Sequence, residues 1–273
     1  TVVLSGGEPF LKPELIEICS FMGEAFSRSS VGILTNGLDT DEILKSVKAI
    51  LEKSKIHSLW IGSSLDGVGE AYDRIRGTRG GFGKFAKTVE CFRKEFPNLN
   101  FSTTFVLTPF NTDQLIPSWE FARDNGLDFF AQFVVPKKAR LPEVFTWGDR
   151  DFCQIENDIT RIIKEMIIKT QSLASFYDSL NVLSDKINLI AKIYYWSRLV
   201  SFQKTSHKFI GKCDAGFKFA MFDPYGNMFF CPLLKDKIAG NIREKDFDVL
   251  WMSEEARNIR RQIEINNCSC WLV

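Results

Sequence analysis

TVVLSGGEP, residues 1–9, is an apolar run followed by a glycine-rich turn, and the same pattern recurs through the first half of the chain. The apolar run predicts a buried strand, and apolar residues at helical spacing follow over residues 14–26. Strand patterns recur at 31–34, 58–65, 101–107 and 129–135, and helical patterns lie between them at 39–53, 82–96 and 112–125. This alternation predicts parallel strands joined by right-handed crossovers. We therefore expect an α/β fold, a partial (β/α)6 TIM-like barrel, with a flavodoxin-like open sheet as the second choice.

The remainder of the chain changes character twice. Apolar residues follow a 3.6-residue period through residues 151–205, which predicts two or three helices. From Cys213 onward, two apolar segments flank the turn-forming residues 223–227, and a helix is expected from about 247 to 265. We expect three parts: a barrel over 1–150, a helical linking segment over 151–210, and a small Cys-rich β-hairpin and helix domain over 211–273.

The overall composition excludes several classes of protein. The chain has 273 residues, 45% of them hydrophobic and 25% charged, which is ordinary for a folded globular protein and not for a disordered or fibrous one. Lys and Arg number 35 against 34 Asp and Glu, so the net charge of +1 favours neither nucleic acid nor an anionic membrane as a partner. No apolar run approaches the roughly 18 residues that a membrane span needs. We expect no nucleic acid and no membrane partner.

The cysteines indicate a metal site near the end of the chain. Four of the seven cysteines lie in the last part of the sequence, at positions 213, 231, 268 and 270. Only two histidines are present, so a metal site there must consist mostly of thiolates. Four thiolates suit an iron–sulfur cluster or structural zinc, and the residues alone leave both open. Cys19 and Cys91 lie on apolar helix faces and are expected to be small core residues.

Polar and glycine-rich residues follow three of the predicted strands. They are Ser5-Gly6-Gly7-Glu8-Pro9, Thr35-Asn36-Gly37 and Ser63-Ser64-Leu65-Asp66-Gly67. In a parallel α/β sheet, ligands bind at the carboxyl ends of the strands. Paired glycines allow a ligand to reach the backbone, and the Glu8 carboxylate accepts hydrogen bonds, so this edge suits an ammonium group. The alternative is equally open at this point: the glycines make a tight turn and Glu8 starts the helix.

The series of motifs resembles the radical S-adenosylmethionine (radical SAM) enzymes. Gly6-Gly7-Glu8-Pro9 is similar to the Gly-Gly-Glu-Pro motif of that family. The blocks Leu34-Thr35-Asn36-Gly37, Ser64-Leu65-Asp66-Gly67 and Tyr72-Asp73-Arg74-Ile75-Arg76-Gly77 follow in the order and spacing of the family. Tyr72 stands where relatives usually have His. The resemblance covers essentially the whole chain.

The resemblance implies a binding site for S-adenosylmethionine. Gly6, Gly7, Glu8 and Pro9 would hold its amino group through backbone carbonyls and the carboxylate. Ser64 would face the methionine carboxylate or the ribose, and Asn36 would line the same end. Arg76 would pair with the carboxylate of the cofactor, although an ion pair with Asp73 or Glu70 is an equal alternative. The catalytic residues beyond these are not identified by the sequence.

The C-terminal cysteines resemble the opening of a SPASM domain, the auxiliary-cluster module of peptide-modifying radical SAM enzymes. The resemblance rests on the spacing of Cys213, Gly226 and Cys231, and on the later segments Gly240-Asn241-Ile242 and Leu250-Trp251. It implies Cys213, Cys231, Cys268 and Cys270 as ligands of an auxiliary iron–sulfur cluster, in a SPASM domain or in its reduced "twitch" version. The pair Cys268-Ser269-Cys270 is tighter than the usual spacing of the family.

The resemblance also implies an activity. A 4Fe–4S cluster would reduce S-adenosylmethionine, and the resulting 5′-deoxyadenosyl radical would abstract hydrogen from a peptide or protein substrate. A flavodoxin- or ferredoxin-type donor would supply the electron, in an anaerobic, reducing cytoplasm. The C-x-x-x-C-x-x-C loop that holds this cluster in relatives does not occur in the sequence, and we expect it upstream of Thr1. The alternative is an inactive homologue that acts as a zinc-stabilised binding module.

Overall fold

The computed structural model describes residues 1–26, 28–134, 147–174, 180–205 and 213–265. Their contacts divide the chain into two compact units. The first comprises the described residues of 1–134 and of 147–197, and the second comprises the described residues from 198 onward. The three-part division expected from the sequence stays a prediction.

The first unit is built on a five-stranded parallel sheet with the strand order β1-β2-β3-β4-β5. Its strands are β1 (Val2–Leu4), β2 (Ser30–Thr35), β3 (Ser58–Ser64), β4 (Asn100–Leu107) and β5 (Asp128–Phe133). Because every strand pairs with its neighbour in sequence, the order never reverses, as it would in a flavodoxin-like sheet. The expected barrel-type α/β fold is confirmed, and the second choice is excluded.

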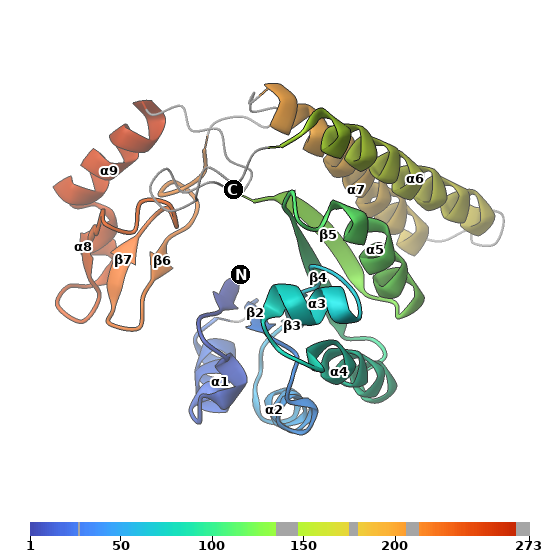
Figure 1. The fold of residues 1–273 in the computed structure, drawn as a ribbon. Helices are drawn as coiled ribbons and strands as arrows, with labels where there is room; N and C mark the ends of the chain where they lie inside the picture. The colour runs from blue at the N-terminus through green and yellow to red at the C-terminus, as the bar shows by residue number, and fades with distance from the viewer. Residues whose placement is uncertain (27, 135–146, 175–179, 206–212, 266–273) are drawn as a thin grey trace. The chain divides into compact units, whose positions relative to one another are not determined.

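The helices of the first unit lie around the outside of this sheet (Figure 1). They are α1 (Leu15–Ala25), α2 (Thr40–Lys53), α3 (Glu70–Arg76), α4 (Gly81–Glu95), α5 (Leu115–Asp124), and the short 3-10 turns η1 (Pro9–Leu11) and η2 (Thr112–Gln114). The sequence pattern missed α3, because seven residues are too few to show a helical period. Asp39 caps α2, since its carboxylate accepts from the backbone N–H of Glu42 at 3.1 Å.

The core lies between the sheet and these helices. Alternate strand residues are fully buried on that side, among them Ile33, Ile61, Phe101 and Phe105. Phe residues pack between the helices and the sheet, with the rings of Phe92 and Phe101 edge to face and their centroids 5.0 Å apart. Phe side chains therefore fill part of this core. Cys19 is also fully buried, and its desolvation raises its pKa to about 11, which is typical of a packed thiol.

The opposite face of the sheet, here called the inner face, is more open. Its residues include Val3, Leu34, Trp60, Ser64, Thr104 and Phe130. Val3 is 48% exposed and Leu34 is 38% exposed. Trp60 lies over Gly32, where a Cβ atom would come within 2.1 Å of the indole. The two glycines Gly32 and Gly62 therefore make room for one large aromatic ring on this face.

Helices α6 (Asp149–Ala174) and α7 (Leu180–Thr205) account for the helical pattern after the sheet. Residues of α7 cover β5, the last strand in the sheet order. The Tyr195 hydroxyl donates to the carbonyl of Ala131, and the Trp196 ring stacks on Phe129 with centroids 6.1 Å apart. Because an uncovered strand edge exposes unpaired backbone groups, this contact satisfies a carbonyl at the sheet's end.

The second unit is small and built around a hairpin. It contains β6 (Met221–Phe222), β7 (Asn227–Phe229), β8 (Gly240–Asn241), α8 (Phe247–Trp251) and α9 (Glu254–Ile265). The predicted turn is confirmed: Asp223 accepts from the backbone N–H groups of Tyr225 and Asn227, both at 2.9 Å, and Gly226 has a φ of 89°. No helix in the described part of the chain has the length and hydropathy to cross a lipid bilayer.

Candidate functional site

Glu8 joins the turns that follow the first two strands. Its Oε1 accepts from the backbone N–H of Phe10 at 3.3 Å, and its Oε2 accepts from the backbone N–H of Asn36 at 2.8 Å. The first contact caps the 3-10 turn η1, so the structural role considered from the sequence is real. An ionised carboxylate has about four acceptor positions, so two remain for a ligand. Glu8 can therefore hold the turn and accept from an ammonium group at once.

The backbone beside Glu8 is open. Gly6 has a φ of 143°, a conformation that L residues with a side chain rarely adopt. A Cβ atom on Gly6 or Gly7 would meet nothing within 4 Å. Neither positive φ nor crowding by the described residues explains a glycine at position 7. A ligand that approaches the backbone closely does explain it.

Asn36 connects Glu8 to the next element along the carboxyl edge of the sheet, here called the rim. Its backbone N–H donates to Glu8, its side-chain Oδ1 accepts from the N–H of Leu38 at 2.8 Å, and its carbonyl accepts from the Tyr72 hydroxyl at 3.5 Å. Asn36 is exposed, which leaves its amide Nδ2 as a donor at the surface. The sequence placed Asn36 at this edge, and the structure brings it into direct contact with Glu8.

Tyr72 occupies the position where relatives usually have His, and it is buried. Only 2% of it is exposed, its ring stacks on Phe85 with centroids 5.7 Å apart, and Phe82 packs against its edge. Burial raises the pKa of its phenol, so the hydroxyl stays protonated and acts as a donor. Tyr72 thus supports the Asn36 loop from the helix side.

Arg76 pairs with Asp66, at 3.2 Å between Nη2 and Oδ2. The alternative partners considered from the sequence, Asp73 and Glu70, were wrong. Asp73 is engaged elsewhere, because its carboxylate accepts from the backbone N–H groups of Gly80 and Phe82 at the start of α4. Arg76 also lies over the Tyr72 ring, 5.9 Å from its centroid. The ion pair with Asp66 therefore holds the Arg76 guanidinium at the rim. Its remaining N–H groups are the donors that a ligand would use.

Asp66 and Asn111 complete this rim. The sequence analysis named Asp66 only as part of the Ser64-Leu65-Asp66-Gly67 block, without a role, and did not name Asn111. Asp66 Oδ1 accepts from the backbone N–H of Val106 at 2.8 Å. Burial raises the pKa of Asp66, while the Val106 N–H and the Arg76 charge lower it. Asn111 is 1% exposed and donates to the carbonyls of Asp66 and Val106, both at 3.1 Å. The available signal was position: both residues follow strands at the carboxyl edge.

Ser64 lies on the inner face at the same end of the sheet. Register places Ser64 opposite Thr104, and Thr104 opposite Phe130. Within the described residues, the Ser64 and Thr104 hydroxyls form no hydrogen bond, and both residues are half-buried. Hydroxyls in this state have donor and acceptor capacity for a ligand.

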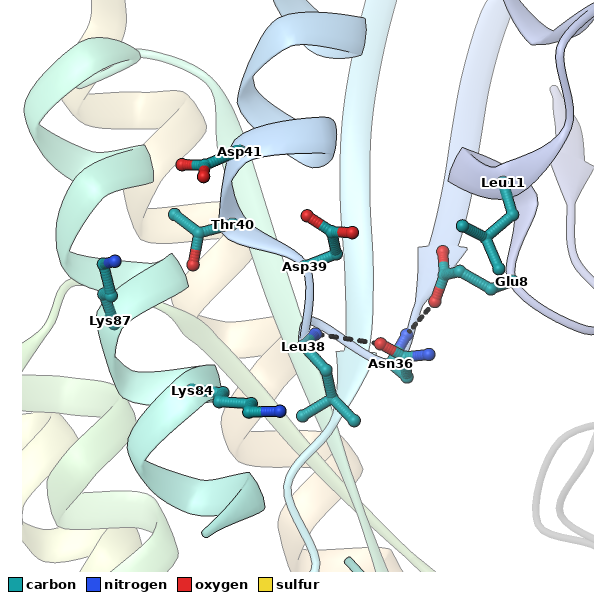
Figure 2. Close-up of a pocket in the computed structure, with 9 residues that line it drawn as sticks. All are labelled: Glu8, Leu11, Asn36, Leu38, Asp39, Thr40, Asp41, Lys84 and Lys87. Carbon is teal, nitrogen blue, oxygen red and sulfur yellow. Dashed lines mark hydrogen bonds between the residues drawn. The ribbon is translucent and has the colours of Figure 1, made fainter.

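A pocket of about 370 Å³ opens beside Glu8 and Asn36, as Figure 2 shows. Carboxylates and lysines line it together, the lysines coming from α4. The lining residues are Glu8, Leu11, Asn36, Leu38, Asp39, Thr40, Asp41, Lys84 and Lys87. No sequence pattern pointed to Lys84 or Lys87 as residues of this pocket.

The second unit holds two of the four expected metal ligands. Cys213 and Cys231 are half-buried and pack against one hydrophobic cluster, which includes Ala215, Phe230 and Leu250. Gly240, from the expected Gly-Asn-Ile segment, has a φ of 139° and lies so close to Leu250 that a Cβ would come within 2.4 Å of it. Cys268 and Cys270 lie outside the described residues. Among the residues that are described, no three potential ligands gather in one place.

The second unit also contains a half-buried cation packed between two aromatic rings. Arg260 of α9 lies between the rings of Trp251 and Phe230, with its Cζ 4.4 Å and 5.0 Å from their centroids. Its Nε donates to the carbonyl of Gly216 at 2.5 Å. Desolvation, and to a smaller degree Arg257, lower the pKa of Arg260. Nη2 of Arg260 is buried and has no hydrogen-bond partner within the described chain.

Comparison with known proteins agrees with this architecture. Residues 213–271 match the SPASM family, described as an iron-sulfur cluster-binding domain. The AdoMet-dependent heme synthase of Methanosarcina barkeri is 26% identical over 272 residues, which cover 97% of this chain and 72% of that protein. The Fe-coproporphyrin III synthase of the same organism is 33% identical over 82 residues, 30% of this chain and 18% of that protein.

Solved structures show the same fold. The crystal structure of Streptococcus suis SuiB matches with a TM-score of 0.62 at 16% identity, over 95% of this chain and 57% of that one. The structure of anSMEcpe with bound AdoMet matches with a TM-score of 0.63 at 17% identity, over 94% of this chain and 64% of that one. The chain thus spans less than two thirds of both solved proteins. The resemblance to radical SAM enzymes with a SPASM-type C-terminal region is confirmed.

Proposed function

We propose that this chain is part of a radical SAM enzyme that binds S-adenosylmethionine at the rim formed by the ends of β1, β2 and β3. One observation carries the proposal: the Glu8 carboxylate keeps free acceptor positions next to the open backbone of Gly6 and Gly7. An ammonium group needs such acceptors, and its approach to the backbone needs glycine. The match to AdoMet-named relatives supports the same assignment.

The chain's own residues bind and orient the cofactor. Gly6 and Gly7 offer backbone carbonyls, and Glu8 offers a charged acceptor. The Pro9 carbonyl already accepts from the N–H of Lys12 at 2.9 Å and can give a ligand only its second lone pair. Asn36 and Ser64 offer one amide and one hydroxyl at the ends of neighbouring strands. Arg76 is held by Asp66 and can direct a remaining N–H toward a carboxylate. The chemistry that a bound 4Fe–4S cluster and S-adenosylmethionine would supply at this site is radical abstraction of hydrogen from a substrate.

We also propose that Cys213, Cys231, Cys268 and Cys270 bind an auxiliary iron–sulfur cluster in the second unit. The chemistry of the donor set supports this, since thiolates suit such clusters. The packing of Cys213 and Cys231 on one hydrophobic cluster and the match over 213–271 add to it. A structural zinc ion is the alternative occupant, and elemental analysis of anaerobically purified protein separates the two.

Two substrate classes are in question. The sequence favoured a peptide or protein side chain, and a structural neighbour, native anSMEcpe, is described with bound AdoMet and the Kp18Cys peptide. A second candidate, an iron tetrapyrrole, is favoured by a specific observation: both curated relatives are named for products of this class, and one aligns with 97% of this chain. Anaerobic assays with iron coproporphyrin and with Cys- or Ser-containing peptides, scored by 5′-deoxyadenosine release, compare the classes directly.

Calorimetric titration with S-adenosylmethionine tests the binding site. We expect Glu8→Gln to weaken binding about tenfold, equivalent to about 1.4 kcal/mol, because the charged acceptor for the ammonium group is lost. The matched control is Glu17→Gln, which removes a carboxylate from the exposed side of α1 and should bind normally. Equal affinities of the Glu8 variant and the control would contradict the assignment.

The remaining partners follow from the same proposal. Reduction of the cluster requires an external donor, for which a flavodoxin or ferredoxin is expected. A reducing cytoplasm is the compartment that suits oxygen-labile clusters. Copurification of iron, and dependence of activity on a reduced flavodoxin, test both expectations together.

A further inference from the structure

Charged side chains of both signs line the pocket beside Glu8 without neutralising one another. Glu8, Asp39 and Asp41 contribute carboxylates, and Lys84 and Lys87 of α4 contribute ammonium groups (Figure 2). Across the described residues, none of these five side chains forms an ion pair. A cation and a carboxylate that face one pocket without touching leave room for a ligand that carries both charges.

Lys84 stands where the helix itself disfavours a cation. It lies in the first turn of α4, at the end where the helix dipole is positive and acidic side chains are favoured. Among the described residues of α4, the first turn contains no acidic side chain. The Asp73 carboxylate, which lies at this end, accepts from the backbone N–H groups of Gly80 and Phe82. The local fold therefore does not explain a lysine here, whereas an anion bound beside it does.

Packing fixes this turn of α4 against the loop that carries Asn36. Gly37 has a φ of 72°, and a Cβ atom there would come within 2.7 Å of the Phe85 ring. Lys84 directly precedes Phe85, so its side chain leaves the helix beside this loop. The Asn36 backbone N–H in turn donates to Glu8 at 2.8 Å. The Lys84 ammonium and the Glu8 carboxylate thus reach one pocket from two different elements (Figure 2).

We propose that Lys84 binds the carboxylate at the methionine end of S-adenosylmethionine, while Glu8 accepts from its ammonium group. The inference rests on the proposed function and deepens it. In an α-amino acid the two charged groups are attached to one carbon atom, so a lysine and a glutamate that share a pocket without pairing match both groups. Arg76 is the other candidate for the carboxylate, but it is already paired with Asp66 and is not among the described residues that line this pocket.

Calorimetric titration with two ligands tests the assignment. S-adenosylmethionine carries the carboxylate, and decarboxylated S-adenosylmethionine keeps the ammonium and sulfonium groups without it. Lys84→Met keeps the length of the side chain and removes its charge, so we expect it to weaken binding of S-adenosylmethionine about fivefold, the upper end for an exposed ion pair. It should leave the affinity for the decarboxylated ligand unchanged. The effect should shrink as salt is added, because Lys84 is exposed.

Three further variants make the result specific. Lys94→Met removes an exposed cation from the other end of α4 and should bind both ligands normally. Glu8→Gln should weaken the two ligands alike, because both carry the ammonium group. Arg76→Met tests the rival partner, and any change it causes should also be the same for both ligands.

Each outcome decides the matter. A loss of affinity in Lys84→Met that is confined to the ligand with the carboxylate supports the proposal. An unchanged affinity for S-adenosylmethionine, or an equal loss for both ligands, overturns it and leaves the proposed function intact. A loss confined to the carboxylate ligand in Arg76→Met, with none in Lys84→Met, would assign the carboxylate to Arg76 instead. Wild-type protein that binds neither ligand would overturn the proposed function itself.

Discussion

The rim of the first unit and the cysteine region of the second unit hold their candidate ligand-binding residues in different ways. At the rim, backbone groups, buried side chains and hydrogen bonds position each candidate ligand-binding residue, from Glu8 through Asn36 to Asp66. In the second unit, the half-buried thiols of Cys213 and Cys231 pack on a small core, of which eight buried residues lie in the described part of the chain. A large sheet-and-helix core therefore holds the rim, whereas a small core holds the cysteine region.

The difference in core size indicates in which of the two units a bound ligand contributes to folding stability. A large core between sheet and helices holds the rim, so cofactor binding there should change affinity and little else. A small core is marginal by itself, and such domains commonly depend on a metal for stability. Five predictions test this contrast.

The largest effect is expected from removing the metal of the second unit. Binding free energies of thiolate-held zinc in small domains are about 10–16 kcal/mol, so loss of a comparable centre should unfold residues 213–265. The first unit should keep its structure. Hydrogen exchange measured by mass spectrometry on Cys231→Ser should show fast exchange in α8 and α9 and unchanged protection in β2 to β4.

The control for this experiment is Cys153→Ser, which removes an exposed thiol from α6. It should leave exchange unchanged in both units. Uniform protection across α8 and α9 in metal-free protein would show that the small core is sufficient and would remove the contrast.

The second effect concerns the buried carboxylate of the rim. Asp66→Ala leaves the Val106 N–H without its acceptor and Arg76 without its partner. An unsatisfied buried donor costs about 1–3 kcal/mol, and we expect a loss of stability in that range. Chemical denaturation of the first unit, followed by the fluorescence of Trp60 and Trp119, measures it. Asp113→Ala, an acidic residue exposed on η2, is the control and should change stability little.

The raised pKa of Asp66 also predicts how the free energy of unfolding changes with pH, and with which sign. Its pKa is raised from 3.8 in the folded state, so the folded chain binds this proton more tightly than the unfolded chain. The contribution of Asp66 to stability is therefore greatest below 3.8 and decreases as the pH rises through the raised value. The difference in unfolding free energy between the wild type and Asp66→Asn should fall across that interval. A difference that rises with pH would contradict the assigned shift.

These elements also show how much of the structure could be predicted from the sequence. The alternation of apolar runs with Gly-rich turns sufficed for the strand order, because parallel strands in a barrel follow chain order. Helix α3 and the Arg76–Asp66 pair were missed, since both depend on how the loop after β3 folds back. The cation between Trp251 and Phe230 was also missed: the three residues are far apart in sequence, and no local pattern brings them together.

The third effect is a change in the affinity for S-adenosylmethionine without a change in stability. A Cβ atom at Gly7 would have no neighbour within 4 Å, and the backbone φ there is not positive. The fold should therefore tolerate Gly7→Ala. A methyl group at this position would obstruct a ligand at the backbone, and we expect affinity for S-adenosylmethionine to fall about tenfold. Gly83→Ala is the matched control, because it also meets nothing within 4 Å but lies within α4. It should stabilise the helix by up to about 1 kcal/mol and leave binding unchanged.

The smallest effect is expected where the rim is held by a long contact. The Tyr72 hydroxyl lies 3.5 Å from the Asn36 carbonyl, at the outer limit of a hydrogen bond, while the ring itself is tightly packed. Tyr72→Phe keeps the packing, so we expect a loss of about 0.5 kcal/mol or less in stability. Tyr225→Phe, 75% exposed in the second unit, is the control. A loss above about 2 kcal/mol from Tyr72→Phe would mean that the hydroxyl holds the Asn36 loop far more strongly than this distance allows.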